Sequence, residues 1–199
     1  FNLRSRFLEL IDREARLSTP HQPGQIVAKM NSLVDPEIIE HLYAAARQGV
    51  MIDLTVRGTC CLRPDVDTRN IRVVSIVDRY LEHSRIYRFG NGGRPEYFLS
   101  SADWMPRNLD RRIELLFPVT DGPTRELLDY LLGLSFKDRR KGRRLRRDGT
   151  YSPPGKTHGQ TRSQRCLYEH FNQRLAEATE EADQDRSPAA LEILRHLRG

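Results

Sequence analysis

His83 and its neighbours have the side chains that phosphoryl chemistry requires. Arg85 follows two positions later, at the start of a strand pattern over residues 85–89. Alternation along a strand predicts that His83, Arg85 and Tyr87 share one side, with Ile86 on the other. A guanidinium orients phosphate oxygens, and an imidazole can attack phosphorus or protonate a leaving oxygen near neutral pH. A His-x-Arg pair is also common without any catalytic role, so these two residues alone do not define a site.

A second polar stretch, residues 100–112, follows another strand pattern over residues 96–100. It contains hydroxyls, an amide, three arginines and the single tryptophan of the chain, and it is too polar for a core strand. We therefore expect one strand end to collect an imidazole, several guanidiniums and small polar donors, with little carboxylate to offset them. That mixture suits a phosphoryl group.

Hydrophobic periodicity predicts the elements that hold these residues. The spacing predicts an amphipathic helix over residues 3–17 and a strand over residues 25–31. Lys29, near the end of that strand, is either a phosphate contact or an edge lysine that reaches solvent. Asp35 is typical of a helix N-cap, and the next strand, over residues 50–56, is followed directly by Arg57. A strand, a helix and a strand in this order predict a parallel crossover unit, whose carboxyl ends gather ligands.

Two further strands, over residues 71–77 and 113–119, follow in the chain. A leucine-rich helix begins at Asp121. Together these patterns predict a compact α/β domain over residues 1–135.

The composition then changes. Residues 137–147 hold eight lysines or arginines and one acid, and residues 149–159 are rich in Gly, Pro, Ser and Thr. We expect a basic arm over residues 136–160, which is either a solvated linker or a polyanion-binding loop. Residues 161–199 form a predicted helical extension, with helices over residues 163–182 and 188–197.

The formal net charge of +6 over 199 residues favours a polyanionic partner, although it also serves solubility. The three cysteines form neither a disulfide framework nor a metal-ligand spacing, which indicates a reducing compartment. No apolar run reaches membrane-spanning length, and no signal peptide is visible. We expect a cytoplasmic location, with peripheral attachment at the inner membrane face left open. Because the chain begins at Phe1, we expect it to be a fragment of something larger.

Four stretches, in the right order, resemble the last catalytic domain of the long-chain bacterial polyphosphate kinases, a family related to the phospholipase D superfamily. They are residues 28–35, 56–64, 70–87 and 100–112. The resemblance covers residues 3–135 and, more loosely, residues 148–151. It implies an α/β fold: a phospholipase D-like half, with a mixed β-sheet flanked by helices, to which a basic, partly helical C-terminal extension is added.

The resemblance also implies a reaction, the reversible transfer of the ATP terminal phosphate to inorganic polyphosphate with Mg²⁺. In the family a phosphohistidine forms on the preceding catalytic domain, which this chain lacks, so we expect the isolated chain to be inactive. The implied partners are ATP or ADP, inorganic polyphosphate, that preceding domain and further copies in a homo-oligomer. No specific nucleic acid and no transmembrane segment are expected. The sequence shows no carboxylate cluster typical of a metal site, so we expect Mg²⁺ to bind together with ATP.

Individual positions match the family motif. His83 matches a histidine near the transferring phosphate that acts as an acid or a phosphate ligand, and Arg57 and His83 both match ATP-binding positions. Arg112 matches an arginine that lines the phosphate site, and Arg85 stands where phospholipase D enzymes have lysine. The remaining matches are to positions near the site: Lys29, Asn31, Ser100, Ser101 and Asn108.

Two alternatives remain open at this point. One is a phospholipase D-type phosphodiesterase that acts as a dimer, against which Arg85 and the run Ser100-Ser101-Ala102-Asp103 weigh. The other is a basic module that binds polyphosphate or nucleic acid without chemistry, through residues 137–147.

Overall fold

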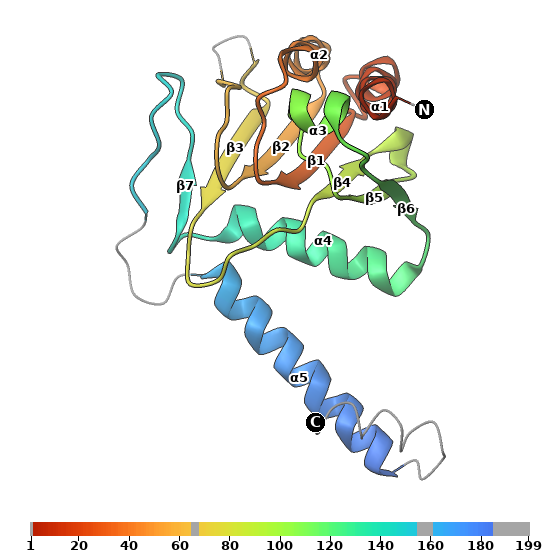
Figure 1. Ribbon diagram of the computed structural model, residues 1–199, viewed down its shortest axis with the longest axis vertical. Coiled ribbons are helices and arrows are strands. Elements are labelled where there is room, and N and C mark those ends of the chain that lie inside the picture. The colour runs from red at the N-terminus through yellow and green to blue at the C-terminus, as the bar shows by residue number, and fades with distance from the viewer. Residues whose placement is uncertain (1, 65–67, 155–160, 185–199) are drawn as a thin grey trace.

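The protein is built on a mixed β-sheet. The computed structural model describes residues 2–64, 68–154 and 161–184. Within these residues the sheet has seven strands in the order β6-β5-β4-β1-β2-β3-β7 (Figure 1). Its three central parallel strands are β1 (Gln25–Met30), β2 (Met51–Val56) and β3 (Ile71–Ile76). The flanking strands, each antiparallel to its inner neighbour, are β4 (Ile86–Phe89), β5 (Glu96–Ser100), β6 (Leu116–Val119) and β7 (Gly142–Arg144). The predicted α/β class with a mixed sheet is confirmed.

Helices cover both faces of the sheet (Figure 1). α1 (Leu3–Leu17) and α2 (Pro36–Arg47) pack against each other on one face, where the short α3 (Pro106–Arg111) also contacts α1. α4 (Gly122–Lys137) crosses the other face, and α5 (Ser163–Gln184) extends away from the body. None of the helices that the structure describes is long and apolar enough to cross a membrane.

The helix starts follow local chemistry that the sequence already displays. α1 spans the predicted residues, and Asp35 caps α2 by accepting a hydrogen bond from the Ile38 amide at 3.0 Å. Asp121 caps α4 in the same way through the Thr124 amide at 2.8 Å. Gly49 follows α2 with a φ of 91°, a conformation that favours glycine. The predicted parallel unit of β1, α2 and β2 is confirmed.

An aromatic cluster fixes the core beneath α1. Phe7, Tyr87 and Trp104 are each fully buried, with ring centroids 4.8–5.6 Å apart. Removing a side chain of this size from water stabilises a fold by roughly 1.5–3 kcal/mol. The polar stretch of residues 100–112 is therefore anchored in the core by the single tryptophan of the chain.

Two strands, β4 and β6, are shorter in the structure than predicted. β4 begins at Ile86, so His83 and Arg85 lie in the preceding loop, although Tyr87 and Ile86 do face opposite sides of the sheet as predicted. β6 begins at Leu116 rather than at residue 113, because Ile113 is fully exposed and unpaired. β6 lies at an edge of the sheet, where Pro118 removes no ladder hydrogen bond that the fold needs.

Part of the basic segment after α4 pairs with the sheet and is not a free arm, although Arg139, Arg143, Arg144, Arg146 and Arg147 are exposed as predicted. Gly142–Arg144 pairs with β3, and Leu145 is buried. The single acid of the run, Asp138, is also buried and organises the turn: its carboxylate accepts hydrogen bonds from the amides of Arg140, Lys141, Gly142 and Ser163 at 2.7–3.3 Å. The hydrogen bonds of Asp138 to nearby backbone amides thus fix the turn that leads into the edge strand β7.

α5 is tied to the body at its first turn. The Asp78 carboxylate binds the Arg162 guanidinium through two contacts of 2.6 and 2.7 Å. The Gln164 side chain exchanges hydrogen bonds with the backbone of Tyr80, each 2.8 Å long. The predicted helix over residues 163–182 is confirmed, whereas the one predicted over residues 188–197 lies outside the described residues.

Candidate functional site

The topology gathers the sequence-predicted residues at one end of the sheet. Lys29, Asn31 and Arg57 lie at the carboxyl ends of β1 and β2. Because β4 is antiparallel to β1, its start lies at the same end, and Lys29 pairs with Ile86 across the ladder. The pairing of β4 with β5 and of β5 with β6 brings Ser100 to that end as well. We call this the strand-end site.

Lys29 connects β1 to the loop that carries His83. Its ammonium lies 2.8 Å from the Ser84 hydroxyl and 2.8 Å from a carboxylate oxygen of Glu82. The side chain is buried, so the prediction of a lysine that merely reaches solvent at an edge does not describe it. These two contacts hold the residues on both sides of His83.

Arg57 is oriented by Asn31. The Arg57 Nε donates to the Asn31 side-chain oxygen at 3.0 Å, and its guanidinium forms no ion pair with any described residue. Gly58 makes the close approach of β1 and β2 possible, because a Cβ there would lie 2.9 Å from the Asn31 carbonyl oxygen. The Asn31 amide nitrogen is buried and has no hydrogen-bond partner within the described ranges. A buried donor in this state is suited to a ligand acceptor.

Asp103 joins two strands of the site. One carboxylate oxygen accepts from the Asn31 backbone amide at 2.7 Å. The Arg85 guanidinium packs against the same carboxylate, with Nε at 3.0 Å and a terminal nitrogen donating at 3.2 Å. Arg85 also donates to the His83 carbonyl oxygen at 3.2 Å. Arg85 is therefore half-buried and held in place rather than free to follow a ligand.

Glu114 organises the hydroxyl and amide groups of the site. It accepts hydrogen bonds from the Ser101 hydroxyl and, at 2.7 Å, from the Asn108 side-chain amide. The Ser100 hydroxyl donates to the Leu115 carbonyl oxygen at 2.6 Å. These three side chains thus shape the loops around the site through protein contacts.

His83 and Arg112 are exposed and, unlike the exposed Ser101, have no described partner. Both side chains are exposed, and neither forms a hydrogen bond or an ion pair with a residue that the structure describes. Arg112 caps the end of α3, and no contact with a described residue links its side chain to Lys29, Arg57 or His83. The structure therefore brings Lys29, Asn31, Arg57 and Arg85 into one connected group, with His83 in the loop that this group supports.

Sequence reasoning missed the carboxylates. The expectation of little carboxylate was wrong, because Glu82, Asp103 and Glu114 each bind side chains of the site. Asp103 lies within the polar stretch of residues 100–112, and Glu82 lies beside His83. Their closeness in sequence to predicted site residues could therefore have identified both as members of the site. Glu114 had none, because only folding brings it to Ser101 and Asn108.

Burial controls the ionisation of two groups beside the site. Burial raises the pKa of Tyr87, and the nearby Asp103 carboxylate raises it further, so the phenol stays protonated and donates to the Ala102 carbonyl oxygen at 2.7 Å. Burial also raises the pKa of the Cys60 thiol to about 11. Cys60 is therefore a neutral packing residue at ordinary pH.

The residues of the site do not fit a protein-held Mg²⁺. No group of three or more His, Cys, Asp or Glu side chains in the described part of the chain is placed to hold a metal ion. The carboxylates that are present are already bound, Glu82 to Lys29 and Asp103 to Arg85. Mg²⁺ prefers free oxygen ligands and usually binds together with substrate phosphates.

The fold is that of the phospholipase D-like α/β proteins. A solved phospholipase D family member, Nuc from Salmonella typhimurium, matches 72% of this chain and 90% of its own with a TM-score of 0.52. At 15% identity that likeness shows the fold alone. A closer match is the crystal structure of polyphosphate kinase from Porphyromonas gingivalis, with a TM-score of 0.82 and 40% identity. It covers 87% of this chain and 27% of that one.

The chain belongs to the polyphosphate kinase family. The model of the polyphosphate kinase C-terminal domain 2 matches residues 1–164. The polyphosphate kinase of Rhodopirellula baltica is 51% identical over 170 residues, which cover 83% of this chain and 20% of the relative. Polyphosphate kinase 1 of Chlorobaculum tepidum is 52% identical over 153 residues, which cover 76% of this chain and 22% of the relative. The chain thus spans about a fifth of the length of these curated relatives.

Proposed function

We propose that this chain is the C-terminal catalytic part of a polyphosphate kinase that transfers the ATP terminal phosphate reversibly to inorganic polyphosphate. The proposal includes a phosphohistidine on a preceding catalytic domain of the same polypeptide and further copies in a homo-oligomer. The observation that carries it is the connected group around Lys29, Asn31, Arg57 and Arg85, which presents His83 at the strand-end site.

Arg57 supplies the charge that a phosphate needs. Its guanidinium has no carboxylate partner among the described residues, and Asn31 fixes its direction. The side-chain nitrogen of Asn31, which has no hydrogen-bond partner among the described residues, can donate to a phosphate oxygen. Phosphoryl transfer depends mainly on positioning and on stabilisation of developing charge, and these two groups provide both.

His83 supplies the proton. Its loop is held by Lys29 through Ser84 and Glu82, and by Arg85 through the His83 carbonyl oxygen. The imidazole itself stays exposed, so a phosphate can reach it. In this role it donates a proton to a bridging oxygen in one direction and accepts it in the other. Arg112 is placed in the proposal as a further phosphate contact, because its exposed guanidinium is not committed to a described carboxylate.

Mg²⁺ enters the proposal with the nucleotide rather than on this chain. The carboxylates near the site are bound by Lys29, Arg85 and the Ser101–Asn108 pair, so no step assigned to these residues depends on a metal that the chain itself holds.

The test uses a polypeptide that contains this chain together with the catalytic half that the proposal requires. We expect His83→Ala to reduce polyphosphate synthesis from ATP by about 10²–10⁴-fold, the range of general acid catalysis, with ATP binding retained. His21→Ala is the matched control, because His21 is also exposed and lies in a loop away from the site. Near-native synthesis by the His83 variant would remove the histidine from the chemistry.

The same preparation separates the proposal from phosphodiester hydrolysis. We expect no release of alcohol from a phosphodiester substrate under conditions that support polyphosphate synthesis. Hydrolysis that depends on His83, without synthesis, would favour a phospholipase D-type activity instead.

A further inference from the structure

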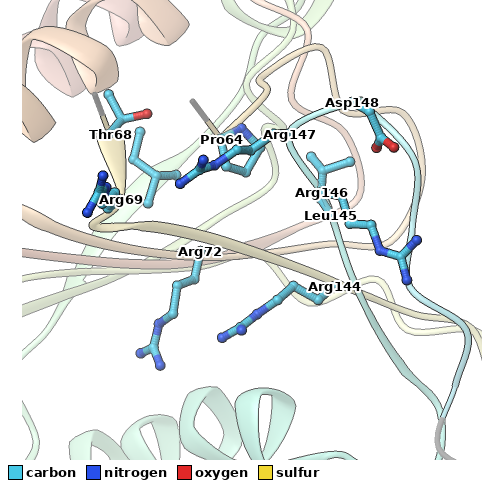
Figure 2. Close-up of a pocket in the computed structure, with 10 residues that line it drawn as sticks. Pro64, Thr68, Arg69, Arg72, Arg144, Leu145, Arg146, Arg147 and Asp148 are labelled. Carbon is cyan, nitrogen blue, oxygen red and sulfur yellow. The ribbon is translucent and has the colours of Figure 1, made fainter. Parts of the chain in front are cut away.

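A second concentration of positive charge lies away from the strand-end site. A cavity of about 630 Å³ opens at the start of β3, between that strand and the hairpin after β7 (Figure 2). Five of its ten lining residues are arginines. They are Arg69, Arg72, Arg144, Arg146 and Arg147. We call this cavity the arginine pocket.

Most of these arginines have no ion-pair partner among the described residues. Arg72 forms an ion pair with Asp53 and lies over the Phe136 ring, 5.4 Å from its centroid. Arg69, Arg144, Arg146 and Arg147 form no ion pair with any described residue. The lining carboxylate, Asp148, is occupied by the Thr150 amide at 2.9 Å and hydroxyl at 2.7 Å.

The backbone holds these arginines in a fixed order. Arg144 pairs with Val74, and the Leu145 amide donates to the Val73 carbonyl oxygen at 3.0 Å. Leu145 is buried and bridges Tyr151, while the Arg146 amide donates to the Thr150 carbonyl oxygen at 2.8 Å. The hairpin is therefore part of the folded sheet. In Figure 2, Arg72 and Arg144 extend side by side toward α4, and Arg147 points to the Thr68 side.

The chemistry of the pocket favours a chain of phosphates. Arginine binds phosphate oxygens bidentately, and several guanidiniums in one cavity suit several adjacent phosphates. The described lining contains no aromatic side chain on which a nucleobase could stack, and stacking is the usual second element of single-strand nucleic acid binding. The uncharged part of the wall is Pro64, Thr68, Ile71 and Leu145.

The arginine pocket is separate from the strand-end site. Ser75, near the end of β3, donates to the Arg57 carbonyl oxygen at 3.1 Å, whereas Arg72 lies near the start of the same strand. Three residues of a strand span roughly 10 Å. A polymer can therefore occupy the pocket while another part of it lies elsewhere.

We propose that the arginine pocket is a second binding site of this chain, which holds consecutive phosphates of inorganic polyphosphate apart from the point of transfer. The identity of the polymer rests on the proposed function, whereas the preference for several adjacent phosphates rests on the pocket itself. The site retains a long chain, and a short anion that cannot reach several arginines gains little from it.

The experiment measures binding of long-chain sodium polyphosphate to the full chain, with sodium triphosphate as the short probe. The test variant combines Arg144→Gln and Arg147→Gln. The matched control combines Arg139→Gln and Arg143→Gln, which removes the same charge from exposed residues of the same segment that do not line the pocket. Circular dichroism confirms that both variants fold.

We expect the test variant to bind long-chain polyphosphate at least about tenfold more weakly, because each lost charge-assisted contact has a large effect. The slope of log affinity against log salt should fall by about one to two. The control variant and the binding of triphosphate should change little.

Three results would contradict the proposal that the arginine pocket binds polyphosphate. Equal weakening by both variants would show that net charge alone acts, and unchanged binding in both would place the polymer elsewhere. Tighter binding of single-stranded RNA than of polyphosphate, through the same two arginines, would assign the pocket to nucleic acid. The His83 experiment is independent. Unchanged polyphosphate binding by the Arg144→Gln/Arg147→Gln variant, with synthesis still dependent on His83, refutes this inference alone. Near-native synthesis by the His83→Ala variant, with binding weakened by the two arginine substitutions, refutes the proposed function alone.

Discussion

The strand-end site and the arginine pocket lie toward opposite ends of β3, and most of their cations are held differently. At the strand-end site, Lys29 and Arg85 are bound by Glu82 and Asp103 and are partly or wholly buried. In the arginine pocket, four of the five guanidiniums have no ion-pair partner among the described residues, and all are exposed.

The difference teaches what each cation can do. A cationic side chain that is buried and ion-paired has a fixed orientation, so it can position a neighbour such as His83. Its charge is neutralised by its partner. An exposed, unpaired cation keeps its charge and adapts to a ligand, but it positions nothing. We therefore assign positioning to Lys29 and Arg85 of the strand-end site, where Arg57 keeps its charge for a ligand, and retention of the polymer to the arginine pocket.

The largest expected effect comes from breaking the pairing at the strand-end site. Asp103→Ala should lower the free energy of unfolding by about 3 kcal/mol. The Arg85 guanidinium loses its carboxylate partner, and the buried backbone N–H of Asn31 loses its acceptor. Urea unfolding followed by the fluorescence of Trp104 measures this directly.

Asp148→Ala is the matched control at the arginine pocket, since that exposed carboxylate binds only Thr150 within the described structure. It should leave the unfolding midpoint almost unchanged. Equal destabilisation by the two substitutions would show that the two ends do not differ in the way described.

A smaller effect concerns pH and salt. The Arg162 guanidinium holds the pKa of Asp78 below its usual range, and the Thr150 hydroxyl and amide do the same for the pKa of Asp148. A carboxyl group with a lowered pKa stabilises the fold above its unfolded pKa, near 4, and this contribution is lost as the pH falls through the folded pKa. Acid should therefore loosen the contact between Asp78 and the start of α5.

Carboxyl NMR titrations at low and high salt distinguish the two causes. Salt should move the pKa of Asp78 toward its ordinary value, because an ion pair is screened, and should move that of Asp148 less, because neutral donors hold it. The same salt response at both residues would contradict this assignment.

The smallest effect tests how closely the loop after β2 is packed. At pH 8 a thiol with a pKa of about 11 is almost entirely protonated, so Cys60 should react with a thiol reagent far more slowly than the exposed Cys61. Mass spectrometry of partially labelled protein gives both rates. Cys61→Ser should remove the fast phase, and labelling of Cys60 at the fast rate would show that this loop opens readily.

Local patterns predicted much of the fold. Hydrophobic periodicity predicted α1 over its observed residues. The N-caps at Asp35 and Asp121 could be predicted because an N-cap carboxylate accepts hydrogen bonds from amides two or three positions away. Strand ends were less accurate, as at Ile86 and Leu116, because pairing with a neighbour decides where a strand stops.

The sequence by itself determined the candidate residues and their order, because the motifs are contiguous and helix and strand periods are local properties. Tertiary structure alone decided which side chains meet. Lys29 binds Ser84 across 55 positions, and Asp103 binds the Asn31 amide across 72. It also placed the basic run as an edge strand, through the buried Asp138. Ion-pair and hydrogen-bond partners are chosen by distance in space, and no spacing in the sequence encodes that distance.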